Sequence, residues 1–436
     1  MNICVVGMGK IGLPLAVHYA EQNNLVTGLD TNTQTVITIN SGGVPFPGEK
    51  DLAEKLYKVV QLKKLFCTTD YSYAIPNAKI ILVIVPLFVN GQGEPDFSVI
   101  DSVTNEIGKL MNKGTQVIYE TTLPIGTTRN RFTKSLENLS EMKEGQDFYV
   151  AFSPERVLTG RVFEDLGKYP KIVGGVSPVS SKAAADFYSE NINFIEREDL
   201  QKPNGVWQVG NSEAAEFVKL AETTYRDVNI GLANQFAKFA HKIELDIYEI
   251  IAAANSQTFS HIHQPGISVG GHCIPIYPQL YLWSDQHATI VEEARKSNLE
   301  MPEYAVALIK KITPNLSGLS VGILGITYRP GVKETAFSGA FALRDILESE
   351  DAKVFVDDPM YSKVETEEKN LRPISDKSKI EILILHTSHD CFDENYFKDF
   401  SNLKIVLDGR NTLNSKWLKS GVALIKLGNG IQQSST

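Results

Sequence analysis

The sequence predicts an α/β protein with two doubly wound Rossmann-like domains, joined by a central helical segment with one long helix. Short runs rich in Val and Ile alternate with helical patterns up to residue 195, and the same alternation returns from Ser317. Between these parts, from Asn211 onward, the pattern is helical. Alternation of this kind indicates βαβ units and a parallel sheet. The expected domain borders are 1–200, 201–312 and 313–436.

The first domain is expected to hold five buried strands with helices between them. The predicted strands are Ile3–Val6, Leu25–Leu29, Lys79–Val85, Gln116–Tyr119 and Tyr149–Phe152. The predicted helices of this part are Leu13–Glu21, Val99–Met111 and Thr128–Leu136.

The central part is expected to be helical over Glu213–Ala240 and Asp246–Asn255, and the apolar face of the first helix is a natural dimerisation surface. The polar tail Gly428–Thr436 is expected to be disordered. The C-terminal part has one predicted helix, Ser338–Ser349, and the predicted strands Ser320–Leu324, Lys353–Val356, Ile380–Leu385 and Lys404–Leu407.

Composition excludes several classes of protein. A net charge of −9, from 43 basic and 52 acidic residues, argues against a non-specific nucleic-acid binder. No run approaches the ~20 apolar residues that span a bilayer, and Met1–Val6 resembles a strand rather than a signal peptide. Cys4, Cys67, Cys273 and Cys391 are widely spaced and form no disulfide framework or metal site. A reduced, cytoplasmic enzyme without a metal is therefore expected.

The hexapeptide Gly7–Gly12 (GMGKIG) follows the first predicted strand and opens a helix. In this context Gly7 permits a tight turn, Gly9 lets backbone approach a pyrophosphate, and Gly12 lets helix and strand pack closely. The helix N-terminus offers N–H groups to phosphates. Asp30, at the end of the second strand, is placed to accept hydrogen bonds from ribose hydroxyls. A tight turn that binds no ligand is the alternative, but strand, helix and Asp30 together favour a dinucleotide.

The type of dinucleotide follows from the residues after Asp30. Thr31, Asn32 and Thr33 follow it, without an arginine for a 2′-phosphate, so NAD is expected rather than NADP. In the C-terminal part, Gly322–Gly325 (GILG) lacks the full fingerprint, and no second NAD is expected.

A second motif, Ser268–Pro275 (SVGGHCIP), places a cysteine directly after paired glycines. A thiolate at Cys273 would be a strong nucleophile if its pKa were lowered locally. The alternative is a small buried cysteine in a glycine-rich turn. His272 is expected to be structural rather than a partner of Cys273, because sequence neighbours point in different directions.

Six ordered segments resemble the UDP-glucose/GDP-mannose dehydrogenase family, and the resemblance covers nearly the whole chain. They are Gly7–Pro14 (GMGKIGLP), Glu120–Thr128 (ETTLPIGTT), Ser153–Gly160 (SPERVLTG), Thr224–Asn234 (TYRDVNIGLAN), Gly270–Pro275 (GGHCIP) and Tyr328–Thr335 (YRPGVKET). The resemblance implies that 1–200 binds NAD, that 201–312 carries a dimer-forming helix and the cysteine loop, and that 313–436 binds the UDP part of a UDP-sugar.

The resemblance also implies catalytic roles for particular residues. Cys273 would form a thiohemiacetal with the C6 aldehyde of the sugar and then a thioester. Lys219, in Ala215–Leu220 (AEFVKL), would stabilise the developing oxyanion. Thr122 would position the reactive water or alcohol, and Glu155 would act in acid–base steps.

The remaining site residues are binding residues. Those expected at the cofactor, beside the three glycines and Asp30, are Lys10, Ile11, Pro86 and Thr122. Those expected at the substrate are Glu155, Arg156, Val157, Lys219, Arg226, His263, Gly270, Gly271 and Arg329.

The chain departs from the family pattern at four positions. Tyr277 stands where the family commonly has Asp, so Glu155 and Thr122 become the candidates for activating the hydrolytic water. Thr223 replaces the usual Asn one helical turn after Lys219, and it remains a catalytic candidate because a hydroxyl still forms hydrogen bonds. Thr159 stands where many members have Glu or Pro, and Phe259 where some members carry Arg.

Three function hypotheses remain open at this point. The segments SPERVL, TYRDVN and His263–Gly266 (HQPG) resemble UDP-N-acetylhexosamine dehydrogenases more than UDP-glucose dehydrogenases. The first hypothesis is therefore a four-electron UDP-sugar 6-dehydrogenase that serves polysaccharide or glycan precursor synthesis, with UDP-glucose as the alternative substrate. A two-electron hydroxyacid dehydrogenase and a non-enzymatic NAD-binding protein are the others. Cys273 in GGHCIP favours the first.

Overall fold

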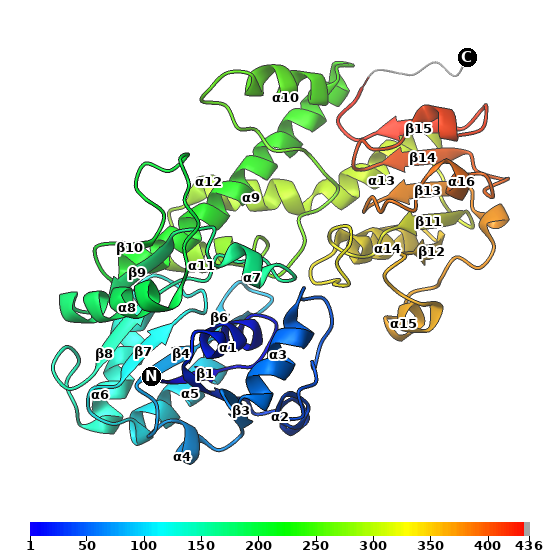
Figure 1. The fold of residues 1–436 in the computed structure, drawn as a ribbon. Coiled ribbons are helices and arrows are strands. Elements are labelled where there is room, and N and C mark those ends of the chain that lie inside the picture. The colour runs from blue at the N-terminus through cyan, green and yellow to red at the C-terminus, as the bar shows by residue number, and fades with distance from the viewer. Residues whose placement is uncertain (431–436) are drawn as a thin grey trace. The chain divides into compact units, whose positions relative to one another are not determined.

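The computed structural model describes residues 1–430, which form two compact units (Figure 1). The first unit comprises Met1–Glu222 with Gln279–Ser284, and the second comprises Thr223–Pro278 with the segment that starts at Asp285. Each unit is built around its own sheet, in which all or most neighbouring strands are parallel, and this confirms the predicted fold class.

The sheet of the first unit has eight strands in the order β10-β9-β8-β7-β4-β1-β2-β3. The strands are β1 (Asn2–Val6), β2 (Leu25–Leu29), β3 (Leu65–Thr68), β4 (Ile80–Val83), β7 (Gln116–Tyr119), β8 (Tyr149–Phe152), β9 (Lys171–Gly175) and β10 (Val206–Gln208). All neighbouring strands are parallel except β8 and β9, which run antiparallel. A small hairpin, β5 (Phe88–Val89) with β6 (Pro95–Asp96), lies outside this sheet.

Strand β1 decides where this sheet can bind a ligand. The chain proceeds from β1 to β2 and β3 on one side and then returns to β4 on the other side of β1. In open parallel sheets, ligands bind beyond the carboxyl ends of the strands at such a switch point. The loops that begin at Gly7 and after Val83 lie at these ends.

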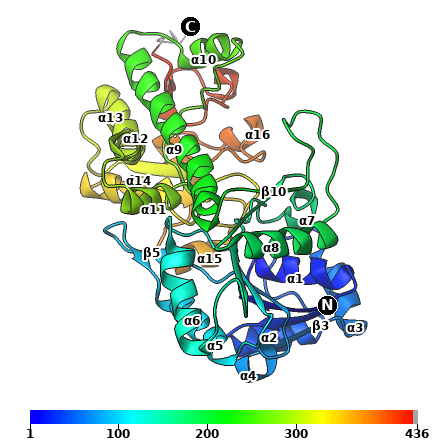
Figure 2. The ribbon, with the colours of Figure 1, turned by 90° about the vertical axis from the view of Figure 1, so that its left-hand side faces the viewer.

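Helices cover both faces of the first sheet. Ile3 and Val5 of β1 belong to one apolar core and Cys4 and Val6 to the other, as the two-residue period of a strand requires. Figure 2 shows α1 and α8 on one side of this unit and α5 and α6 on the other. The helices of this unit are α1 (Gly12–Glu21), α2 (Thr33–Asn40), α3 (Leu52–Gln61), α4 (Tyr71–Ala74), α5 (Ser98–Leu110), α6 (Lys134–Ser140), α7 (Val162–Asp165) and α8 (Pro178–Asn191).

The second unit has a five-stranded parallel sheet in the order β12-β11-β13-β14-β15. Its strands are β11 (Ser320–Leu324), β12 (Lys353–Asp357), β13 (Ile382–Leu385), β14 (Ile405–Asp408) and β15 (Ala423–Lys426). Its helices are α10 (Ile247–Asn255), α12 (Thr289–Leu299), α13 (Met301–Ile312), α14 (Gly339–Ser349), α15 (Lys363–Glu368) and α16 (Glu394–Phe397). Helices α9 (Ser212–Lys242) and α11 (Tyr277–Ser284) contribute residues to both units.

Two sequence predictions need correction. The helix predicted over Thr128–Leu136 is a π-helical stretch over Thr128–Thr133 that continues into α6. The polar composition predicts disorder from Gly428 onward, but the Gly428 carbonyl accepts the N–H of Ile247 at 2.9 Å and the Gly430 N–H donates to Leu245 at 2.9 Å. These backbone bonds hold the start of the tail, and the rest of that prediction, residues 431–436, lies outside the described residues.

Candidate active site

The loop after β1 has the backbone geometry that its glycines predicted. Gly7 has φ +97°, and a Cβ there would lie 2.8 Å from the Ile84 carbonyl oxygen. A Cβ on Gly12 would lie 1.8 Å from the Gly7 carbonyl oxygen, whereas a Cβ on Gly9 would meet nothing within 4 Å. The first and third glycines are therefore required by packing, and Gly9 borders open space that a pyrophosphate can fill.

Asp30 lies at the carboxyl end of β2 and is bonded to the same loop. Its Oδ2 accepts the N–H of Met8 at 2.9 Å, and its Oδ1 accepts the N–H of Asn32 at 2.8 Å. Lys10 and Pro86 are exposed and Ile11 is half-buried around this edge of the sheet. Loop, carboxylate and open space together fit a dinucleotide.

The segment Glu120–Thr128 follows β7 and is held down by a buried carboxylate. Thr122 is buried, and Glu216 of α9 accepts hydrogen bonds from the N–H of Gly126 at 2.5 Å and from the N–H and hydroxyl of Thr128 at 2.8 and 2.7 Å. Burial raises the pKa of Glu216 to about 7 although these hydrogen bonds oppose it.

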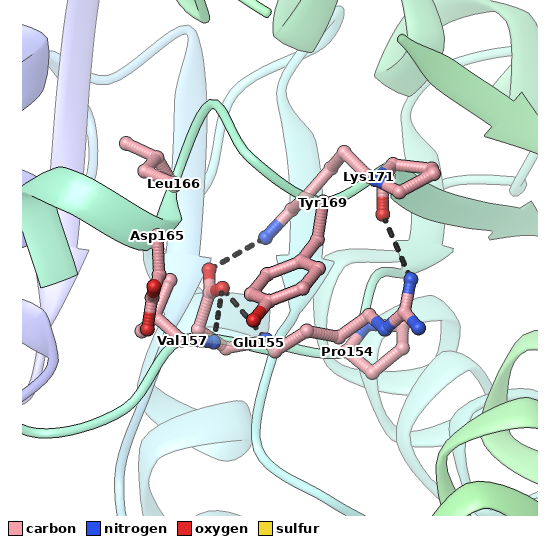
Figure 3. A pocket seen from close by; sticks show the side chains of 9 residues that line it. Pro154, Glu155, Val157, Asp165, Leu166, Tyr169 and Lys171 are labelled. Carbon is pink, nitrogen blue, oxygen red and sulfur yellow. Dashed lines mark hydrogen bonds and ion pairs between the residues drawn. The ribbon is translucent and has the colours of Figure 1, made fainter. Parts of the chain in front are cut away.

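Glu155 lies in the loop after β8, and its carboxylate points toward the Lys171 ammonium (Figure 3). Its Oε2 accepts from Lys171 Nζ at 2.8 Å, and its Oε1 accepts the N–H groups of Arg156 at 2.7 Å and Val157 at 3.3 Å. Burial alone would raise the pKa of Glu155, but the Lys171 ammonium and these bonds outweigh it and lower the pKa. The carboxylate is therefore ionised at neutral pH.

Lys219 of α9 is packed against the same loop. Its Nζ donates to the backbone carbonyl of Glu155 at 2.9 Å and lies 3.3 Å from Glu222 Oε1. Glu222 in turn accepts from Arg156 Nε at 3.0 Å. The structure thus brings Glu155, Arg156 and Lys219 together within the first unit.

The loop that carries Cys273, Gly270–Pro275, belongs to the second unit. It packs against the segment that begins at Tyr328. The Gly271 N–H donates to the Ala336 carbonyl at 2.8 Å, and a Cβ on Gly270 would lie 2.5 Å from Cβ of Tyr328. YRPGVKET and GGHCIP are therefore neighbours, although more than fifty residues separate them. Cys273 itself is a free, exposed cysteine, which contradicts the alternative of a buried structural one.

His272 and Tyr277 lie close to Cys273 in the chain, and each has a defined contact. His272 Nε2 lies 3.4 Å from Glu334 Oε2. The N–H of Tyr277 donates to the Cys273 carbonyl at 2.9 Å, so the tyrosine that replaces the family's Asp begins α11.

The other predicted residues of the second unit have varied surroundings. Thr223 is buried and Arg226 is exposed on α9. His263 is half-buried, and its N–H donates to Asn229 at 2.9 Å. The Arg329 guanidinium lies 5.8 Å from the centre of the Tyr328 ring. Two departures from the family pattern, Thr159 in the first unit and Phe259 in the second, are exposed.

Sequence reasoning missed the residues that surround the Glu155 carboxylate. Lys171 opens β9, where its side chain is only 4% exposed, and it lies between Glu155 and the buried Glu120. The available signal was a lysine at the start of an apolar run, KIVGG. Within residues 1–430, no three His, Cys, Asp or Glu side chains are grouped to hold a metal ion, and no helix is long and apolar enough to cross a bilayer.

Three family models match the chain in order. They describe the NAD-binding domain (residues 1–192), the central domain (213–300) and the UDP-binding domain (322–415) of the UDP-glucose/GDP-mannose dehydrogenase family. The chain belongs to this family. It is therefore an NAD-dependent UDP-sugar dehydrogenase, which confirms the predicted family, cofactor and enzyme class.

Individual members of the family are similar over their full length. A UDP-N-acetyl-D-mannosamine dehydrogenase of Pyrococcus horikoshii is 33% identical over 421 residues, which cover 95% of this chain and 96% of that protein. The solved structure of UDP-D-ManNAc dehydrogenase from Pyrococcus horikoshii has a TM-score of 0.87 at 31% identity, with 99% and 100% of the two chains covered. The UDP-N-acetyl-mannosamine dehydrogenase Cap5O of Staphylococcus aureus has a TM-score of 0.84 at 28% identity, with 99% of both chains covered.

Proposed function

We propose that this UDP-sugar dehydrogenase oxidises the C6 hydroxyl of a UDP-N-acetylhexosamine, with UDP-N-acetyl-D-mannosamine as the first candidate, to the uronate. The observation that carries the proposal is Cys273, a free and exposed thiol on a loop that packs against Tyr328 and is hydrogen-bonded to the Ala336 carbonyl. The names of the full-length relatives support the choice of sugar. Such a product would serve polysaccharide or glycan precursor synthesis.

The proposed chemistry consists of two oxidations at one carbon. The C6 alcohol first loses a hydride and a proton and becomes an aldehyde. The Cys273 thiolate adds to this carbon, and the resulting thiohemiacetal loses the second hydride to give a thioester. Water then attacks the thioester carbon, the C–S bond breaks, and the carboxylate and the free thiol are released. NAD, when bound, supplies the acceptor for each hydride, so two are consumed per sugar.

The residues of the first unit have proposed roles that follow from their charges. The Lys219 ammonium would stabilise the oxyanion that develops at C6, which is usually a large catalytic contribution. The ionised Glu155 would accept a proton from the hydrolytic water, since Tyr277 cannot act as a base at neutral pH. Thr122 would position the reacting oxygen, and Thr223 would replace the amide of the family's Asn by a hydroxyl.

The proposed binding residues fall into one set for NAD and one set for the UDP-sugar. Gly7, Gly9, Lys10, Ile11, Gly12, Asp30, Pro86 and Thr122 would hold NAD. Arg156, Val157, Arg226, His263, Gly270, Gly271 and Arg329, together with Glu155 and Lys219, would hold the UDP-sugar. We assign 1–200 to the cofactor, 201–312 to dimerisation and the cysteine loop, and 313–436 to the UDP part.

We also propose that the enzyme is a homodimer through α9 and that it works in the cytoplasm. Tyr225, Leu232, Phe236 and Phe239 are large apolar side chains that α9 leaves exposed. Their spacing of seven, four and three residues places them along one face of the helix. An exposed apolar stripe of this kind is typical of a protein interface.

Stoichiometry tests the proposed function directly. UDP-N-acetylmannosamine, UDP-N-acetylglucosamine and UDP-glucose are each supplied with NAD, and NADH is measured against sugar consumed. Two NADH per sugar are expected with a UDP-N-acetylhexosamine, and one NADH with an accumulating aldehyde would overturn the proposal. Preference for UDP-glucose would retain the chemistry and reject the substrate.

Substitution of the nucleophile tests the covalent route. Cys273→Ser is expected to lose the four-electron turnover because a serine hydroxyl stays protonated at neutral pH and is a far weaker nucleophile than a thiolate. Cys391→Ser is the matched control, since Cys391 is a second free and exposed cysteine. Full activity of Cys273→Ser would exclude the thioester.

A further inference from the structure

A buried charge cluster lies directly behind Glu155 in the first unit. Lys171 Nζ lies 2.8 Å from Glu155 Oε2 and 3.2 Å from Glu120 Oε1, and it also lies 4.7 Å from the centre of the Tyr188 ring. The Tyr188 hydroxyl donates to Glu120 Oε1 at 2.5 Å. The cluster therefore holds one ammonium between two carboxylates, away from solvent.

Three neighbouring strands of the sheet bring this cluster together. Glu120 follows β7, Glu155 lies in the loop after β8, and Lys171 begins β9, which runs antiparallel to β8. The antiparallel pairing matters because it places the first residue of β9 at the edge where the two preceding strands end. A parallel β9 would place Lys171 at the opposite edge, far from both carboxylates.

The two carboxylates differ in what surrounds them. Glu155 accepts hydrogen bonds from Lys171, Arg156 and Val157 and is 11% exposed, and a pocket with room for about one water molecule lies beside it. Glu120 is buried, and its Oε2 has no hydrogen-bond partner among residues 1–430. Burial raises the pKa of Glu120, whereas Lys171 helps to lower the pKa of Glu155. Glu155 is therefore the more exposed of the two carboxyl groups and the one with the lower pKa.

We propose that Lys171 is a positioning residue for this reaction, which fixes the orientation and the charge of Glu155 while Glu120 and Tyr188 hold its ammonium in place. The inference rests on the proposed role of Glu155 toward the hydrolytic water. A carboxylate that is held ionised has an acceptor lone pair for the proton that water releases. The Lys171 side chain is only 4% exposed and its ammonium is ion-paired with Glu155 and Glu120, so its proposed action is through Glu155.

The charged and titratable groups around Glu155 come from several elements. Nearby opposite charges shift a carboxyl pKa by about 1–3 units, so Lys171 is a main determinant of its charge. The groups that interact electrostatically with Glu155 are Lys171, Glu120, Lys219, His18 and Tyr19. Arg156, Asp165 and Tyr169 line the same pocket.

The test compares Lys171→Met with Lys171→Arg through the pH dependence of turnover. In Lys171→Met, the acidic limb of the kcat–pH profile is expected to move to a higher pH by about 1–3 units. Below the shifted apparent pKa, kcat is expected to fall about tenfold per pH unit. The acyl-enzyme is expected to accumulate, which intact-mass analysis of acid-quenched protein detects as an adduct on Cys273. Arginine restores a cation and is expected to restore the limb.

Two further variants separate positioning from folding. Lys171→Met with Glu120→Gln removes one positive and one negative buried charge, so it keeps the charge balance and is expected to show the same shifted limb. Lys113→Met is the matched control, because Lys113 forms an exposed ion pair with Asp147 in the same unit. An unshifted limb in the folded double variant would overturn the proposal.

An optical measurement keeps this test independent of the proposed activity. Infrared difference spectra between the wild-type protein and Glu155→Gln report the ionisation of Glu155, and the same pair is compared in the Lys171→Met background. Conversion from carboxylate to acid is expected at a higher pH without Lys171. Absence of NADH from every UDP-sugar would reject the proposed function, whereas an unchanged Glu155 titration would reject the role of Lys171.

Discussion

Gly12 and Gly9 belong to one motif, yet only Gly12 is required by the packing of the protein itself. A Cβ on Gly12 would lie 1.8 Å from the Gly7 carbonyl oxygen, and the helix could not remain packed on β1. A Cβ on Gly9 meets no protein atom within 4 Å, so it would obstruct only a ligand that approaches the loop. At the residue scale, one glycine serves packing and the other serves binding.

This difference predicts two distinct phenotypes. Gly12→Ala is expected to destabilise the protein by about 1–3 kcal/mol, as overpacking does, and a thermal melt measures this as a lower Tm. Gly9→Ala is expected to retain the Tm and to weaken NAD binding, measured by fluorescence titration with NADH. Equal losses of Tm in the two variants would contradict the division of roles.

At the scale of elements, the Glu216 carboxyl group joins α9 to the Glu120–Thr128 segment. Glu216 lies one turn before Lys219, and it accepts three hydrogen bonds from Gly126 and Thr128. The segment that carries Thr122 and the helix that carries Lys219 are thereby tied together inside the first unit. These hydrogen bonds also place the titratable Glu216 carboxyl group between α9 and the Glu120–Thr128 segment.

The titration of Glu216 predicts a pH dependence of stability. Its pKa is about 7 in the folded protein and 4.5 ordinarily, so the folded state binds the extra proton between these values. The stability that this proton contributes is complete below pH 4.5 and is lost as the pH rises through 7. The loss is on the order of 3 kcal/mol.

Thermal melts between about pH 4.5 and pH 8.5 measure this effect, since the range covers the interval between the two pKa values. The Tm of the wild-type protein is expected to fall relative to that of Glu216→Gln as the pH rises, because the amide does not titrate. Glu213→Gln on the same helix is the control. The pKa of Glu213 is lowered, because its hydrogen bonds, that to Arg129 foremost, outweigh the effect of burial. Parallel Tm curves for wild type and Glu216→Gln would contradict the prediction.

At the scale of the whole molecule, the exposed stripe of α9 predicts self-association. Phe236→Glu places a charge within the apolar stripe, and it is expected to halve the mass in solution, which light scattering measures after size exclusion. Phe66→Glu, an exposed phenylalanine on strand β3, is the control and is expected to retain the wild-type mass. A wild-type protein of 48.2 kDa in solution would reject the homodimer.

The prediction of the elements succeeded where the local pattern was strong. β2, β7, β8 and β11 have the predicted bounds, because each is a compact apolar run between breakers. β3, β9, β10 and β15 were not predicted. The run KIVGG of β9, for example, begins with a lysine whose burial depends on carboxylates that follow two other strands.

By itself, the sequence determined the fold class, the dinucleotide loop and the family, because each depends on residues that are close together along the chain. GMGKIG follows a strand and opens a helix, and GGHCIP is a continuous motif. Only the tertiary structure decided that Lys171 lies between Glu120 and Glu155, and that GGHCIP packs beside YRPGVKET. The physical reason is that an ion pair or a backbone contact between distant segments depends on strand order and direction. No local pattern of residues encodes the distance between two such side chains.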